Sequence, residues 1–352
     1  MRPKGSAQLR RLQMRINGVA IPTRYDNETK SVIGEPREAL PLGTNKAFCE
    51  VWLTSDKGVE MEWEFTRVPL PPRPPAPDQS QQETVTQLNR MRRAALLPDV
   101  AIQPALCLAA ARHSRYLLAN RLEPIHTEEP GRPEFYGKDH TERSERAGYF
   151  EPSFEVIAEG DSGPIAVQRL IDAPYHRSAL LQPGAFDVGA GLAKDRITLL
   201  CALTTRQEVL VYPTDGQLDV PVSWEDTETP DPLRLYPGAE RVTGYPITLH
   251  SFAEDEHLKL IEINLTGPES RSVLCYINTP DNDTELDNTI IIIPQKPLLP
   301  LSLYRARIVA KTAAGREITR VWQFTTTKTV PTKPTLPKPT PKPPTPPTKK
   351  KK

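Results

Sequence analysis

The chain has 352 residues, more than one ordinary domain needs, so we expect two or three domains. Its 38% hydrophobic and 25% charged residues suit globular units, while its 39 prolines gather at the joints between them. Residues 328–352 carry eight Lys and no acid, so the rest of the chain has a formal net charge of −7 against +1 for the whole. A mildly acidic body excludes a basic nucleic-acid groove, and the short apolar runs exclude a transmembrane helix.

Residues 12–70 predict an all-β domain. The stretch LPLGTNKAFCEVWLTSDKGVEMEWEFT (40–66) alternates apolar and polar residues on both sides of a Gly-containing turn. This pattern is typical of a β-hairpin, and we expect Trp63 and Phe65 to point into a sandwich core. The region has room for few strands, so we expect a partial sandwich.

A Pro-rich linker (71–81) leads into a central region (82–206) that begins with helices. The segments ETVTQLNRMRRAAL and ALCLAAARHSRYLLANRL place apolar residues at helical spacing, and Pro104 suits a first helical turn. We expect His113, inside the second helix, to be a structural residue.

The central region continues with a loop, EPIHTEEPGRPEFYG, and a short helix, HTERSERAGY. A strand and a helix then lead to APYHRSALL, where His176 follows a proline at the start of another helix. The N–H groups of a helix start disfavour a charged imidazole and leave a neutral nitrogen free to bind. The region closes with FDVGAGLAKDRITLLCALT, which predicts a strand hairpin without a phosphate-binding loop.

Residues 207–327 predict a second β-sandwich, and residues 328–352 a disordered Pro/Thr/Lys-rich tail. The stretch 299–326 resembles 40–66, with Trp322 and Phe324 at the positions of the earlier aromatic pair. We expect His250 and His257 at the surface of this β region.

The four cysteines, Cys49, Cys107, Cys201 and Cys275, show no CxxC pair, which argues against a zinc ribbon or a dense disulfide framework. A bridge between Cys107 and Cys201 is one alternative. Buried free thiols are the alternative that the general burial of Cys favours.

Several short pieces of the central region, taken in order, resemble the CAP superfamily (cysteine-rich secretory protein, antigen 5, pathogenesis-related 1) in its bacterial, SCP-like form. The pieces are QLNRMRRAALLPDVAIQP, AAARHSRYLLANR, PIHTE, RAGY, FEVIAEG with APYHRSALL, and VGAGLA. The two β regions resemble bacterial immunoglobulin-like domains. The resemblance implies a multidomain chain with a central α-β-α sandwich, flanked by all-β immunoglobulin-like sandwiches.

The resemblance also implies a cleft with His and Glu side chains. By position these are His126, Glu155 and His176, our candidate catalytic residues. The family's second Glu falls near Ala173 and is not acidic here, although Asp172 is adjacent. Two imidazoles with a nearby carboxylate could hold a divalent metal such as zinc, so His126 and His176 are candidate metal ligands with Glu155 beside them.

Three functions follow. The first is a secreted or cell-surface binding module for extracellular polymers, lipids or proteins, with a basic tail that contacts anionic surfaces. The second is a metal-assisted, peptidase-like hydrolase using the His/Glu trio. The third is a structural protein with a vestigial cleft. We favour the binding module over an enzyme. Family analogy implies an extracellular location, although the opening residues lack the apolar segment of a signal peptide.

Overall fold

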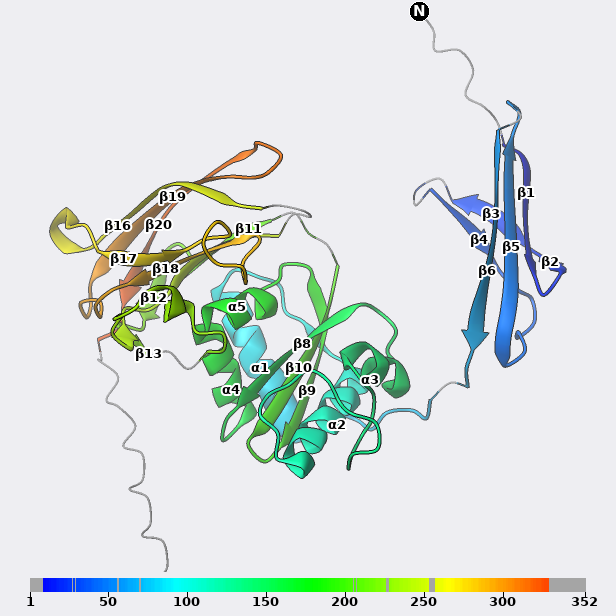
Figure 1. The fold of residues 1–352 in the computed structure, drawn as a ribbon, viewed down its shortest axis with the longest axis horizontal. Helices are drawn as coiled ribbons and strands as arrows, with labels where there is room; N and C mark the ends of the chain where they lie inside the picture. The colour runs from blue at the N-terminus through cyan, green and yellow to red at the C-terminus, as the bar shows by residue number, and fades with distance from the viewer. Residues whose placement is uncertain are drawn as a thin grey trace, which may run out of the picture. The chain divides into compact units, whose positions relative to one another are not determined.

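The computed structural model describes residues 9–328 except 27, 29, 56, 70, 205, 207, 226–227 and 253–256 (Figure 1). The chain divides into two compact units, Met1–Pro72 and Arg73–Lys352. The predicted disorder of the tail falls on residues outside the described part of the chain, apart from Lys328.

The first unit is one twisted sheet with a small hairpin beside it. The sheet has the strand order β2-β1-β5-β6, all antiparallel, and β3 pairs with β4. The strands are β1 (Leu9–Ile16), β2 (Val19–Ile21), β3 (Thr23–Asp26), β4 (Ser31–Gly34), β5 (Gly43–Leu53) and β6 (Gly58–Arg67).

The hairpin predicted from 40–66 is confirmed as β5 and β6, but the predicted burial of its aromatic pair is wrong. Trp63 remains 37% exposed and Phe65 is only half-buried. The physical reason is that β6 is the last strand of its sheet, with no second four-stranded sheet packed over it among the described residues of this unit. The equivalent Trp322 and Phe324 are buried, as expected.

The central domain has three layers. Its sheet has the order β7-β9-β10-β8. Helices α2 and α3 cover one face through an Ala-rich cluster, while α1, α4 and α5 cover the other. The elements are α1 (Gln79–Ala94), β7 (Ala101–Ile102), α2 (Pro104–Asn120), α3 (His140–Ala147), β8 (Ser153–Glu159), α4 (Gly163–Asp172), α5 (Pro174–Leu180), β9 (Ala185–Ala193) and β10 (Arg196–Leu203). The predicted α-β-α sandwich is confirmed.

Helix α2 lies unusually close to β9, and two glycines permit it. A Cβ added at Gly189 would lie 2.1 Å from the carbonyl carbon of Leu106, and one at Gly191 would lie 2.0 Å from that of Ala110. These distances are far below van der Waals contact, and the obstructing atoms are backbone. The glycines of the VGAGLA segment therefore bring the helix carrying His113 against the sheet.

The described residues of the second unit that follow β10 form a β-sandwich. One sheet has the order β11-β15-β18-β17 and the other β12-β20-β19-β16, with β12 parallel to β20. The elements are β11 (Val209–Tyr212), β12 (Gln217–Val220), β13 (Trp224–Glu225), β14 (Val242–Thr243), β15 (Ile247–Ser251), β16 (Lys259–Thr266), β17 (Cys275–Asn278), β18 (Thr289–Pro294), β19 (Leu303–Lys311) and β20 (Glu317–Thr326), with short 3₁₀ turns at Pro232–Leu235 and Pro268–Ser270.

One apolar cluster extends from the central domain into this sandwich, from Val85 on α1 to Phe324 on β20. The multidomain organisation with β regions on both sides of a mixed α/β domain is confirmed. The immunoglobulin-like character of the β regions stays a prediction.

The expected surface position of His250 is wrong. The side chain is fully buried in β15, where Nδ1 lies 2.9 Å from Thr289 Oγ1, because both faces of this strand are covered. Burial lowers the pKa of His250 to about 3. His257 is exposed, as expected.

All four cysteines are free thiols, so the alternative of a bridge between Cys107 and Cys201 is wrong. Burial raises the pKa of Cys107 to about 11 and that of Cys201 to about 12. In the described part of the chain, each helix is too short or too polar to cross a membrane.

Candidate functional site

The structure brings His126 and Glu155 together. His126 lies in the loop after α2, and Glu155 lies in β8 with its carboxylate buried. His126 Nδ1 is 3.0 Å from Glu155 Oε1. The imidazole is 59% exposed, so its Nδ1 is held by the protein while Nε2 is the nitrogen left for a ligand.

Arg143 of α3 anchors Glu155 from the opposite side. Its buried guanidinium donates from Nη2 to Glu155 Oε2 at 2.6 Å and to the carbonyl oxygen of His126 at 3.2 Å. Burial alone would raise the pKa of Glu155, but hydrogen bonds from His126 and Arg143 and the nearby positive charges outweigh it and hold this pKa below its usual range. Glu155 is therefore a carboxylate that orients His126.

A second buried pair lies directly behind this one. His113 Nδ1 is 2.9 Å from Glu128 Oε1, and His113 Nε2 is 2.8 Å from the carbonyl oxygen of Ile125 and 3.8 Å from Glu155 Oε1. Glu128 Oε2 accepts the backbone N–H groups of Tyr136 and Gly137. His113 is structural, as predicted, and its contacts fix the loop that carries His126.

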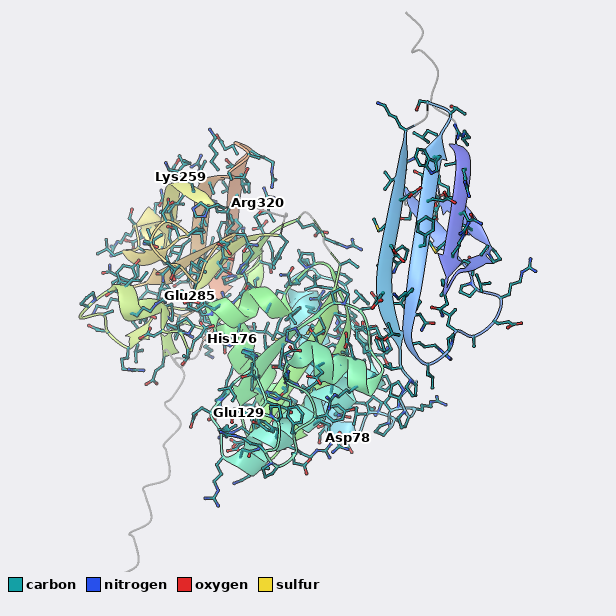
Figure 2. The ribbon with its side chains drawn as sticks, turned by 45° about the vertical axis from the view of Figure 1, so that its right-hand side comes forward. Asp78, Glu129, His176, Lys259, Glu285 and Arg320 are labelled. Carbon is teal, nitrogen blue, oxygen red and sulfur yellow. The ribbon has the colours of Figure 1, made fainter. Side chains whose placement is uncertain are left out.

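His176 has a different acidic partner, Glu228. One oxygen, Glu228 Oε1, accepts the backbone N–H of His176 at 2.9 Å and lies 2.7 Å from its Nδ1. The Glu228 carboxylate is fully buried, while the imidazole is 27% exposed. Figure 2 places His176 where the central domain meets the C-terminal sheets. The acid beside His176 is thus supplied by a segment 52 residues further along the chain.

The residues around His176 dock α5 on the sandwich. The Tyr175 hydroxyl donates to the Asp283 carboxylate and accepts from Arg234 Nη1 at 2.8 Å. Asp172, next to the position where the family has its second Glu, accepts the Tyr245 hydroxyl at 2.7 Å. Burial raises the pKa of Asp172, although the Tyr245 hydrogen bond and Arg177 oppose that effect.

The two predicted histidines therefore lie in two separate hydrogen-bonded pairs. In the part of the chain that the structure describes, no group of three or more His, Cys, Asp or Glu side chains is placed to hold a metal ion. The arrangement does not fit a metal bound by both imidazoles. Among the residues that the structure describes, the hydrogen bonds of these two side chains involve no Ser, Thr or Cys side chain.

Sequence reasoning missed Glu128, Arg143 and Glu228. Arg143 lies in the piece that precedes RAGY, and Glu128 lies two residues after His126. An acidic residue close in sequence to a candidate His is a signal that could have identified Glu128. Glu228 offered no such signal, because only the packing of the sandwich against α5 brings it to His176.

Comparison with known proteins gives a family match for the central domain. Residues 85–201 match the model of CAP, described as the Cysteine-rich secretory protein family. No curated protein sequence matches the chain.

Several solved structures are similar in part. An extracellular SCP-domain protein of Bacillus anthracis is 17% identical, with 47% of this chain and 67% of that chain covered and a TM-score of 0.32. An outer surface protein of Borrelia burgdorferi is 19% identical, with 36% and 93% covered and a TM-score of 0.31. A cysteine-rich secretory protein of Staphylococcus aureus is 12% identical, with 53% and 68% covered and a TM-score of 0.27.

Proposed function

Residues 85–201 form a CAP domain, and from this premise we propose that the chain is an extracellular, surface-associated binding protein rather than an enzyme. His126 is the residue that meets the ligand. The partners are cell-surface polymers, lipids or proteins, and the Lys-rich tail adds attraction to anionic surfaces. The description of the family as secretory supports the location.

The observation that carries this proposal is the state of His126. The side chain is exposed, yet its ring is held by a buried carboxylate that is itself held by Arg143. Such a ring is pre-organised for recognition, because little rotamer entropy is left to lose when a ligand binds. Covalent or metal-assisted hydrolysis would need a side-chain nucleophile or a set of metal ligands beside His126, and its contacts among the described residues include neither.

The hydrolase and the vestigial-cleft alternatives gain no specific support from the geometry. Glu155 already accepts hydrogen bonds on both oxygens, from His126 and Arg143, so it is not available as a general base. A vestigial cleft gives no reason for an exposed imidazole to be fixed by two buried charges.

Two measurements test the proposal with the full chain. Protease treatment of intact producing cells should degrade the protein if it is on the surface. Co-sedimentation with purified cell envelopes should show binding that falls about tenfold in His126→Ala. The matched control is His257→Ala, because His257 is an exposed imidazole of the C-terminal sandwich. Full protection from protease, or equal binding by both variants, would overturn the proposal.

A further inference from the structure

The edge strand β6 of the first unit presents an uncovered surface. β6 lies at the end of its sheet, and among the described strands it pairs with β5 alone (Figure 1). Every residue of β6 except Phe65 is exposed, including Val59 at 64% and Met61 at 58%. Its outer backbone edge is therefore open to a further strand.

One face of this strand is apolar. Val59, Met61 and Trp63 alternate along β6 and so point to the same side. In β5 the residues opposite them are Val51, Cys49 and Ala47, which continue the apolar face across the sheet.

The β3–β4 hairpin covers this apolar face at the end away from β6. Beyond β5, the face continues on β1, where the β3–β4 hairpin packs. A Cβ built on Gly34 of this hairpin would meet the side chains of Met14 and Ile21. Nothing comparable covers Val59 and Met61 among the described residues of this unit. A sheet that is apolar on one face gains stability when that face is buried, so this end is suited to a partner.

The opposite face of β6 is acidic. Glu60 lies across from Glu50, which pairs with Arg11 at 2.8 Å, and Glu62 lies across from Phe48. Neither Glu60 nor Glu62 forms an ion pair among the described residues. Glu64 has Lys46 at 3.3 Å. Opposite charges that face each other on neighbouring strands stabilise a sheet, so a basic strand beside β6 would be favoured by Glu60, Glu62 and Glu64.

This stripe argues against pairing of β6 with β6 of a second copy. Such a pair would bring the glutamates of both strands to one face and place Glu near Glu. We propose that β6 instead accepts an extended strand from a partner protein in which basic and apolar residues alternate. The partner's basic side chains would face Glu60, Glu62 and Glu64, and its apolar side chains would extend the face formed by Val59, Met61 and Trp63.

The probe is a short synthetic peptide of alternating Arg and Val, titrated against the full chain by calorimetry. The matched controls are a Glu/Val peptide and two Arg/Val peptides N-methylated on one or the other backbone edge. We expect the Arg/Val peptide to bind at least about tenfold more tightly than the Glu/Val peptide. Only one of the methylated peptides should lose binding, because strand addition uses one peptide edge.

Variants of the exposed residues complete the test. Met61→Asp should weaken binding of the Arg/Val peptide, and Glu60→Lys/Glu62→Lys should reverse the preference between the peptides. Glu38→Lys, an exposed change outside the sheet, should leave both unchanged. Equal loss with both methylated peptides, an unchanged preference in the double variant, or self-association of the chain that the double variant abolishes would each overturn the proposal.

Discussion

Replacing Arg177 by Met should separate the CAP domain from the sandwich that follows it. The Arg177 guanidinium is fully buried in the last turn of α5. It donates to the carbonyl oxygens of Ile171 at 2.6 Å and Pro246 at 2.9 Å, and it lies 4.6 Å from the ring centre of Tyr212 and 5.1 Å from that of Tyr245. One side chain thus ties a helix end of the CAP domain to strands and loops of the sandwich.

The cost of this change can be estimated from these contacts. Methionine fills much of the volume but leaves two buried carbonyl oxygens without their donor, at about 1–3 kcal/mol each. Loss of the desolvated cation–π contacts adds about 2 kcal/mol. Relief from burying a charge offsets part of this sum, so we expect a loss of roughly 4 kcal/mol in the free energy of unfolding.

Urea and thermal unfolding of the full chain, followed by circular dichroism, measure this loss. At roughly 4 kcal/mol the midpoint of the Arg73–Lys352 unit should fall by roughly 10 °C. Arg320→Met is the matched control, because Arg320 is exposed on β20 (Figure 2). A loss below about 1 kcal/mol in the Arg177 variant would refute the reasoning, since it is within the range of an ordinary surface change.

Three further predictions concern other buried positions. Gly191→Ala should lower the free energy of unfolding, measured with urea, by about 3 kcal/mol, because the backbone of α2 must move to make room. The control Gly160→Ala should lower it much less, because its Cβ would meet nothing closer than 3.5 Å. Equal losses in the two variants would contradict this reasoning. In Glu228→Met, nitrogen NMR should show the His176 proton moving from Nδ1 to Nε2; an Nε2–H form already present in the wild type would count against the assigned contact. The folded pKa of His250, about 3, lies below the unfolded value, so its contribution to stability is complete above about pH 6.5 and is lost as the pH falls towards 3. Compared with His250→Phe, the wild type should lose up to about 1.4 kcal/mol more per pH unit in acid titrations of stability, and parallel curves would exclude this role.

The order of elements in the central domain could be predicted because its signals are local. Periodic apolar residues predict α1 and α2, and alternating residues around a turn predict β9 and β10. Gly189 and Gly191 could be recognised as part of a strand hairpin. The reason for glycine at these positions could not, because it is the close approach of a helix backbone about 80 residues earlier in the chain.

Contacts between distant segments could be predicted only where the family resemblance supplied them. His126 and Glu155 follow from the family resemblance, whereas Glu228 reaches His176 only through the packing of two domains. The sequence around His250 predicts a surface residue, because the side chain is buried only through the packing of segments that lie far apart in the chain. Trp63 shows the reverse error, because its hairpin pattern resembles that of Trp322 but lacks the covering sheet.

The apolar cluster that runs from Val85 to Phe324 has a consequence for how this protein is made. A ribosome releases the CAP segment well before β15 to β20, so α5 must wait for strands that do not yet exist. During that interval the apolar side of the helix is exposed to solvent and to other nascent chains. A chain truncated between residues 201 and 245 should therefore show more chaperone association and aggregation than the full chain.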